Sequence, residues 1–397
     1  MLTSGFDVDA LSCVVTARTG SAFIGALEEL DLPLRSRYEG AAILVTGGAG
    51  FIAGQTLRTL LRYKPARVVV VDTNENALAE LVRDLRSEGA IPASCRFELR
   101  LADVTRPMLS RIVREDGPFD SVLAFAAAKH VRSERDAVSA LHMLNVNING
   151  TLRTVEYALQ ANPDCDVFIV STDKAASPAS MMGASKRVME QAVIGSFPNT
   201  TTTRFANVAF SSGSLLESWL IRLGRGQVLP VPAETERFFV SPIEAGQLCT
   251  SASVAPPGSI VVPASGAVES IDLQQALSDV LESMSLQPVI FHDEAAALGY
   301  TAGPSERRVL VTPRDTAGEK PAEVFLGAGE SQSAWQPNMD VVTSDFPAEP
   351  ALELAAYLAK AVDDHVEPNL EDVGSLLRQA LANFDHVSSS SRLDDRI

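Results

Sequence analysis

Short apolar runs alternate with helical stretches through the first half of the chain. The runs are AAILVTG (41–47), ARVVVVD (66–72), CRFELRLAD (95–103), SVLAFAAA (121–128), DVFIVST (166–172) and TTTRFANVAF (201–210). Between most of them, apolar residues recur at the three- to four-residue spacing of amphipathic helices. Continuous apolar runs separated by helices are typical of parallel strands that are buried on both faces. The pattern predicts an α/β fold, a Rossmann-type doubly wound parallel sheet.

The same pattern divides the chain into four parts. Residues 1–39 contain helical periodicity and predict an N-terminal extension, for which we expect a docking or dimer-contact role. Residues 40–210 carry the alternating runs and predict the dinucleotide-binding domain. Over 211–330, proline-rich loops separate shorter elements, which indicates a smaller substrate-binding lobe. We expect the dinucleotide-binding domain to contribute some residues to substrate binding. Over 331–397 two amphipathic helices precede a polar tail that we expect to be disordered.

Composition narrows the class of protein. Of the 397 residues, 46% are hydrophobic, enough for a sizeable core, and the formal charge is −17. That charge argues against nucleic-acid or anionic-membrane partners, since both select a basic face. The four cysteines are widely spaced, which favours reduced thiols over disulfides or a metal site. No signal-peptide pattern or bilayer-length apolar run is present, so we expect a soluble, cytoplasmic protein without a metal.

The segment VTGGAGFIAG (45–54) joins the first apolar run to the first helix. Gly47 permits a tight turn, Gly50 lets the backbone approach a pyrophosphate, and Ala53 keeps the helix close to the sheet. Asp72 ends the second run, where its carboxylate would bind ribose hydroxyls and repel a 2′-phosphate. We therefore expect NAD, with NADP less favoured. Asp103, which ends the third run, is either an adenine contact or a solvated strand end.

Several further segments resemble nucleotide-sugar 4,6-dehydratases of the extended short-chain dehydrogenase/reductase superfamily. More narrowly, they resemble the polysaccharide-biosynthesis branch that acts on UDP-N-acetylglucosamine. The resemblance covers roughly residues 41–330, and many members of that branch carry membrane-spanning segments. The segments are FAAAKHV (125–131), NVNINGT (145–151), VSTDKAASPASMMGASKR (170–187), RFANVAFSSGS (204–214) and TPRDTAGEKPAEVF (312–325).

The resemblance implies catalytic roles around the motif STDK. It places Thr172 near the sugar 4-position and gives Asp173 and Lys174 the roles of acid and base in the elimination. Lys186 is similar to the lysine of a Y-x-x-x-K motif, but Met182 stands at the tyrosine position. Since a thioether exchanges no proton, this leaves open which group takes the C4 hydroxyl proton: Thr172, or a water held by Lys186.

The resemblance implies weaker assignments elsewhere. Lys129 and His130 would line the sugar or nicotinamide side, Asn207 would contact the sugar phosphate, and Arg237 would hold the diphosphate. A structural histidine and a surface salt bridge are the alternatives for His130 and Arg237. Asn147 would orient the active site. The remaining expected cofactor contacts are Phe51, Ile52, Val104, Ala126 and Ala127, together with Lys186.

These assignments predict an NAD-dependent lyase. A nucleotide-diphosphate sugar, most simply UDP-N-acetylglucosamine, would be oxidised transiently at C4, lose water across C5–C6 and regain the hydride at C6. Two alternatives remain open: a 4-epimerase or C5-inverting dehydratase of the same fold, and a non-catalytic dinucleotide sensor. The helical extensions at both ends favour a homo-oligomer.

Overall fold

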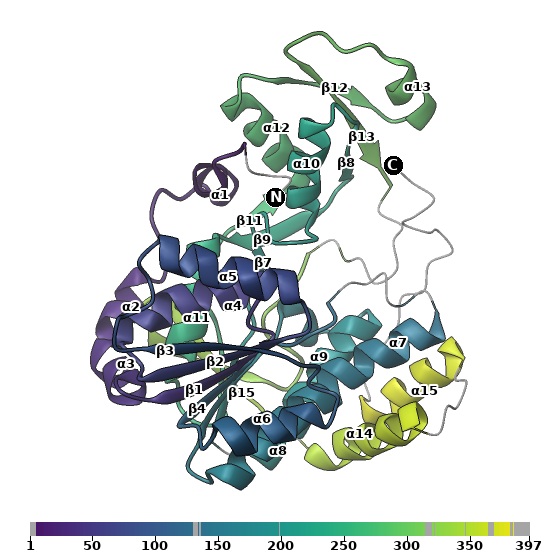
Figure 1. The fold of residues 1–397 in the computed structure, drawn as a ribbon. Helices are drawn as coiled ribbons and strands as arrows, with labels where there is room; N and C mark the ends of the chain where they lie inside the picture. The colour runs from purple at the N-terminus through teal and green to yellow at the C-terminus, as the bar shows by residue number, and fades with distance from the viewer. Residues whose placement is uncertain are drawn as a thin grey trace.

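The computed structural model describes residues 5–129, 134, 136–197, 199–313, 320, 322–345, 347–363, 369–381 and 384. At its centre is a nine-stranded sheet in the order β14-β15-β10-β6-β5-β4-β1-β2-β3 (Figure 1). Seven neighbouring strands, from β3 to β10, are parallel, and β15 and β14 continue the sheet antiparallel. The strands are β1 (Ala42–Thr46), β2 (Arg67–Asp72), β3 (Arg96–Leu101), β4 (Ser121–Ala124), β5 (Asp166–Val170), β6 (Thr200–Thr203), β10 (Ile260–Pro263), β14 (Ser331–Gln336) and β15 (Met339–Thr343). This architecture confirms the predicted doubly wound sheet.

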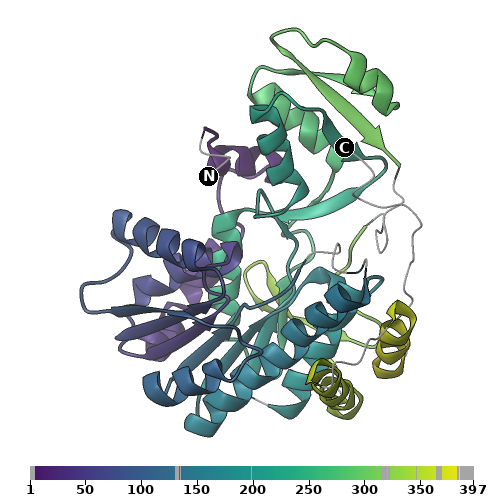
Figure 2. The same ribbon diagram turned by 45° about the vertical axis from the view of Figure 1, so that its right-hand side comes forward.

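Helices cover both faces of this sheet, which explains why its strands are uniformly apolar. Along β1, Ile43 and Val45 belong to one core cluster while Leu44 belongs to the cluster on the opposite face. The first face is covered by α2 (Ile24–Glu29), α3 (Asp31–Tyr38), α4 (Phe51–Leu60), α5 (Glu75–Ser87) and α11 (Pro242–Ala252). The second is covered by α6 (Met108–Asp116), α7 (Ala137–Leu144), α8 (Thr151–Ala161), α9 (Met181–Ser196), α14 (Ala348–Asp363) and α15 (Leu370–Ala380). Both ends of the chain thus supply helices to the sheet unit (Figure 2).

A smaller lobe stands beyond the carboxyl ends of the parallel strands (Figure 1). It holds two three-stranded sheets and a separate core around Trp219. Their strands are β7 (Asn207–Val208), β9 (Glu236–Val240) and β11 (Ser270–Asp272), and β8 (Leu229–Pro232), β12 (Gln287–Phe291) and β13 (Glu306–Thr312). The helices of the lobe are α10 (Leu215–Gly224), α12 (Leu273–Ser283) and α13 (Glu294–Gly299).

The N-terminal extension joins the two units. Its first helix, α1 (Val8–Thr16), puts Leu11 and Val15 into the core of the lobe, whereas α2 and α3 pack against the sheet unit. Between them, Arg18 forms a salt bridge of 2.7 Å with the almost fully buried Glu244 of α11. The extension therefore docks on its own chain.

The sheet unit also takes segments from beyond residue 210, so the two units are interleaved in sequence. Helix α11 packs on α4 so closely that a Cβ on Gly246 would lie 2.4 Å from the carbonyl oxygen of Gln55. The β14–β15 hairpin was not predicted, whereas the two expected C-terminal helices are present as α14 and α15. The polar tail lies outside the described residues. Among the helices that the structure describes, none is both long enough and apolar enough to cross a bilayer.

Candidate active site

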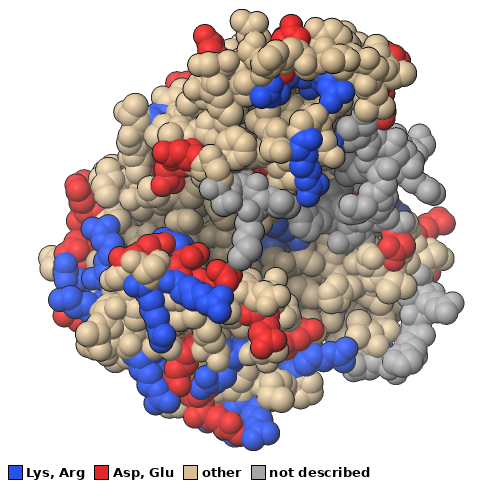
Figure 3. Space-filling view, turned by 45° about the horizontal axis from the view of Figure 1, so that its top comes forward, with Lys and Arg blue, Asp and Glu red and all other residues tan. Residues whose placement is uncertain are grey.

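A cavity of about 590 Å³ lies at the carboxyl ends of the parallel strands, where the lobe faces the sheet. Figure 3 looks onto this side of the molecule, where acidic and basic side chains are interspersed over the lower part. The expected cofactor residues line one part of the cavity: Gly47, Gly50, Phe51, Ile52, Asp72, Asp103, Val104, Ala126 and Ala127. The expected reaction and substrate residues line the rest: Lys129, Thr172, Asp173, Lys174, Met182, Lys186 and Asn207. Sequence and structure thus bring most of the predicted residues to one place.

The glycine turn between β1 and α4 fits a dinucleotide. Gly47 has φ +65°, and a Cβ there would lie only 2.4 Å from the backbone nitrogen of Ala126. Gly50 immediately precedes α4, so the free N–H groups at the start of this helix face the turn. Asp72 supports the turn by accepting hydrogen bonds from the N–H groups of Ala49 (3.1 Å) and Asn74 (2.9 Å). The exposed backbone of the turn, together with the positive end of the α4 dipole, suits the binding of a pyrophosphate.

In the cofactor half, side-chain hydrogen bonds fix the loops that follow β3 and β4. Asp103 accepts hydrogen bonds from the backbone N–H (2.8 Å) and the hydroxyl (2.7 Å) of Thr105, which fixes the end of β3. A π-helical turn, η3 (Asn145–Gly150), follows α7. Within it, the buried Asn147 bonds both backbone groups of Ala128, at 2.8 and 3.0 Å, and the hydroxyl of Ser185. Asn147 therefore ties the loop after β4 to α9.

The motif STDK forms a compact cluster at the end of β5. The 3₁₀ turn η4 (Asp173–Ala175) begins there, and Asp173 is only 1% exposed. Its Oδ1 accepts hydrogen bonds from the Thr172 hydroxyl (2.9 Å) and from Lys174 Nζ (3.1 Å). Its Oδ2 is buried and has no hydrogen-bond partner among the described residues. A buried carboxylate with one unused oxygen can serve an incoming ligand.

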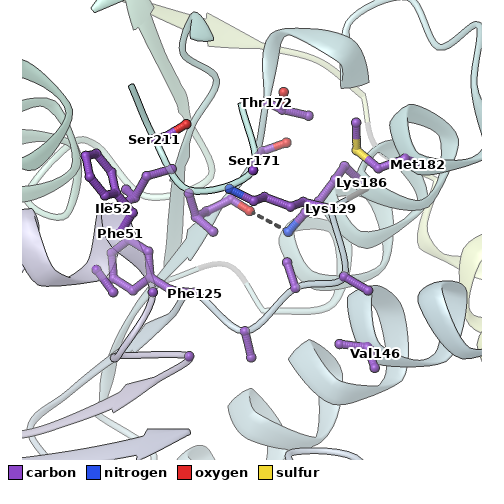
Figure 4. Close-up of a pocket in the computed structure, with 18 of the residues that line it drawn as sticks. Phe51, Ile52, Phe125, Lys129, Val146, Ser171, Thr172, Met182, Lys186 and Ser211 are labelled. Atoms are coloured by element: carbon purple, nitrogen blue, oxygen red, sulfur yellow. Dashed lines mark hydrogen bonds between the residues drawn. The ribbon is translucent and has the colours of Figure 1, made fainter. Parts of the chain in front are cut away.

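Lys186 lies in the same cavity with Met182 one turn earlier on α9 (Figure 4). Its ammonium donates a 3.1 Å hydrogen bond to the carbonyl oxygen of Val170. Burial lowers the pKa of Lys186 to about 8, although the nearby Glu190 opposes this shift. The backbone N–H of Met182 donates to Glu134 at 3.0 Å, and the Met182 side chain is almost fully buried. The reactive half thus contains an amine with a pKa of about 8 beside a thioether that cannot exchange a proton.

The predicted substrate residues differ in their placement. Lys129 lines the cavity and donates to the carbonyl oxygen of Ser212, and burial lowers its pKa. Asn207 lines it too, and its Oδ1 lies 3.5 Å from Lys174 Nζ. Arg237 lies in β9 outside the lining residues, and its guanidinium donates to the carbonyl oxygens of Glu236 and Lys320. His130 lies outside the described residues.

The structure adds residues that sequence reasoning missed. Ser171, His142 and Val146 line the cavity from the sheet side, and Ser211 and Ser214 line it from the lobe. Ser171 and Ser211 fall within motifs already singled out, STDK and RFANVAFSSGS, so those motifs carried a usable signal. Val146 likewise falls within the quoted motif NVNINGT, whereas no local pattern distinguishes His142 from ordinary helix residues.

Fold and site together define an extended short-chain dehydrogenase/reductase: a glycine turn after β1, an acidic residue ending β2, and a buried lysine on α9 facing the same cavity. The family described as polysaccharide biosynthesis protein matches residues 43–333, and the chain belongs to this family.

Individual relatives match at lower identity. The uncharacterized membrane protein MJ1061 of Methanocaldococcus jannaschii is 33% identical over 201 residues, 50% of this chain and 54% of that protein. The probable polysaccharide biosynthesis protein EpsC of Bacillus subtilis is 30% identical, over 57% of this chain and 38% of that protein. A UDP-N-acetylglucosamine 4,6-dehydratase (inverting) of Campylobacter jejuni is 24% identical, over 69% of this chain and 78% of that enzyme. The match spans about half or less of the first two relatives' own length.

Solved structures share the fold. Pen from Bacillus thuringiensis superposes with a TM-score of 0.62 at 21% identity, covering 78% of this chain and 90% of that chain. The UDP-glucuronic acid 4-epimerase from Bacillus cereus, solved with UDP-glucuronic acid and NAD, gives a TM-score of 0.52 at 16% identity. It covers 84% of this chain and 99% of that chain.

Proposed function

We propose that this chain is an NAD-dependent nucleotide-sugar 4,6-dehydratase whose substrate is UDP-N-acetylglucosamine. The observation that carries the proposal is the cluster of Thr172, Asp173 and Lys174, which shares one cavity with the glycine turn and with Lys186. A sensor that only bound a dinucleotide would have no use for a buried carboxylate–amine pair at this edge. The similarity to a C. jejuni dehydratase of that substrate supports the same assignment.

The cofactor half favours NAD over NADP. The Asp72 carboxylate stands beside the turn that would hold the pyrophosphate, where it can accept hydrogen bonds from ribose hydroxyls. A 2′-phosphate at the same place would meet a like charge. Bound there, the dinucleotide would supply reversible hydride acceptance, from C4 of the sugar and back to C6.

The chain's own residues would perform the proton chemistry. Once C4 is a ketone, the C5 hydrogen is acidic, so a base can remove it while an acid protonates the departing 6-hydroxyl. In the roles that the resemblance implies, Lys174 is the base and Asp173 the acid. Their contact of 3.1 Å lets a proton pass between them, and the unpartnered Asp173 Oδ2 remains available to the sugar. The ammonium of Lys186 would stabilise negative charge at the C4 oxygen.

Met182 favours dehydration over simple epimerisation. An epimerase of this fold relies on a tyrosine at this position to move the C4 proton, whereas a dehydratase has additional acid and base groups. The Thr172 hydroxyl, or a water held by Lys186, would relay that proton here.

All four cysteines are free, which supports a reducing compartment and hence our inference of a cytoplasmic enzyme.

Mass spectrometry of reaction products tests the proposal. Purified protein with NAD⁺ is incubated with UDP-, GDP- and dTDP-sugars, and loss of one water from UDP-N-acetylglucosamine is the expected result. Asp173→Asn and Lys174→Ala should each lower the rate by about 10²- to 10⁴-fold, the usual contribution of acid–base groups, while NAD⁺ remains bound. Asp84→Asn, on the exposed side of α5, is the matched control. A product of unchanged mass would indicate an epimerase instead, and near-full turnover by either active-site variant would refute the assigned roles.

A further inference from the structure

A buried carboxylate from a distant part of the chain lies behind the catalytic pair. Glu323 is only 4% exposed and is not among the residues that line the cavity. One carboxylate oxygen lies 3.9 Å from Lys174 Nζ, and the other accepts a 3.0 Å hydrogen bond from Lys320. Nothing in the proposed reaction uses this residue, although burying a carboxylate is costly unless it is paired.

The segment that carries Glu323 is fixed against the turn that carries Lys174. A Cβ on Gly327 would lie 2.6 Å from the carbonyl oxygen of Ala176, so the two backbones are in direct contact. Lys320 donates a hydrogen bond from Nζ to the carbonyl oxygen of Ser177. Such contacts on either side of Glu323 give its carboxylate little freedom to move away from Lys174.

An ion-pair network anchors the far end of the same segment. Glu330 accepts two hydrogen bonds from the fully buried Arg204, at 2.7 and 2.8 Å, and also binds Arg187. Arg204 in turn pairs with Glu190, which accepts a hydrogen bond from the cavity residue Ser171. The segment is therefore built into the wall of the site.

We propose that Glu323 is a positioning residue for Lys174 in the elimination step, an inference that rests on the proposed dehydratase function. The Lys174 ammonium is shared among three oxygens, from Asp173 (3.1 Å), Asn207 (3.5 Å) and Glu323 (3.9 Å). Without Glu323, the amine would lose one of the oxygens that fix its position beside Asp173, and its direction toward the C5 hydrogen would change. Glu323 thus fixes the position of the Lys174 amine from outside the residues that line the cavity.

Isotope effects on UDP-N-acetylglucosamine dehydration test this role. In Glu323→Gln we expect the rate of water loss to fall by about tenfold to a hundredfold, the size of a small misplacement of a reacting group, with little change in KM. Because only the elimination is slowed, the isotope effect of C5 deuteration should grow while that of C4 deuteration shrinks. Glu323→Asp, which keeps the charge, should recover part of the rate.

Glu330→Gln is the matched control, because it makes the same chemical change in the same segment without touching Lys174. If Glu323 served only to hold the segment in place, both variants would share one pattern of isotope effects, and the inference would be wrong. Wild-type isotope effects in Glu323→Gln would also overturn it. If the wild-type protein turned over no sugar nucleotide at all, the proposed function itself would fail.

A second readout needs no substrate. Acetylation of Lys174 by acetic anhydride, followed by peptide mass spectrometry, reports how firmly the ammonium is held. Removing the Glu323 charge should raise this rate about fivefold relative to the exposed Lys64, the effect of one charge about 4 Å away even in water. An unchanged ratio would show that Glu323 does not act on Lys174, whatever the reaction proves to be.

Discussion

The two halves of the cavity are built in different ways. In the cofactor half, the turn after β1 is shaped by backbone contacts: Gly47 lies against the backbone of Ala126, and the N–H of Ala49 donates to Asp72, 23 residues away. In the reactive half, the residues that follow β5 and β6 are held by side chains from a remote segment: Lys320 is 143 residues from Ser177, and Glu330 is 126 residues from Arg204. One half depends on bare glycine backbone, and the other on buried charge.

This difference teaches which substitutions each half tolerates. A glycine cradle fails when any side chain is added, because the Cβ occupies space that a ligand or a neighbouring strand needs. A buried ionic cluster fails when one partner is removed, because the remaining charges cannot be solvated. The predictions below break one half at a time.

The largest effect is expected from the ionic anchor. Arg204→Met leaves Glu190 and Glu330 buried without their main partner, so it should lower the free energy of unfolding by about 3–5 kcal/mol. Denaturant unfolding measures this loss. Arg58→Met, which breaks a partly exposed pair with Glu88, should cost no more than about 1 kcal/mol. If both variants lost the same free energy of unfolding, the stability of the reactive half would not depend on its buried charges, and the contrast between the two halves would be wrong.

The same anchor gives a dependence on acid. Burial alone would raise the pKa of Glu330, but hydrogen bonds and ion pairing with Arg204, aided by Arg187, hold it at about 2. A carboxyl whose pKa is lowered on folding stabilises the protein above its unfolded value, about 4.5, and loses this contribution as the pH falls toward about 2. Arg204→Met should flatten that part of the stability curve.

A second, smaller effect is expected from the cofactor half. Gly47→Ala forces the turn away from Ala126, so NAD⁺ affinity should fall by about tenfold to a hundredfold, the cost of overpacking a tight contact. Gly89→Ala is the matched control: it has nearly the same positive φ, +67°, but open space around it. Calorimetric titration with NAD⁺ should show normal affinity in the control. Loss of binding in both variants would mean that backbone strain, rather than close approach, explains the result.

The same difference accounts for what the sequence could predict. Strands β1 to β6 and the glycine turn were predictable because their signals are local: an apolar run, then two glycines at fixed spacing. Asp173 and Lys174 directly follow such a run and Thr172 ends it, but the resemblance gave all three their catalytic roles. Resemblance added Lys186 and Asn207, which spacing alone would not single out.

The roles of the remote residues could not be predicted from the sequence, even though Glu323 lies in the quoted segment TPRDTAGEKPAEVF. Glu323 and Glu330 lie in a segment without regular periodicity, and only the folded chain shows that both carboxylates are buried. The β14 strand was missed because most of its residues are exposed, and β10 because four residues between proline-rich loops are too few for a clear pattern. Arg237, which the resemblance places at the diphosphate, also donates a hydrogen bond to the backbone of Lys320, a contact that no sequence pattern indicates.

The smallest effect is expected from pH, and it tests the charge state of Lys186 in the reactive half. Because burial lowers its pKa to about 8, this side chain is an ammonium at pH 7 and largely neutral at pH 9. If the ammonium stabilises negative charge at the C4 oxygen, the dehydration rate should fall as the pH rises through about 8, by about tenfold between pH 7 and 9. Lys186→Arg, which stays charged, should move this fall to higher pH, whereas Lys129→Arg should leave its midpoint unchanged. A rate that rises through pH 8 would instead assign Lys186 the role of base for the C4 proton, the role left open by Met182.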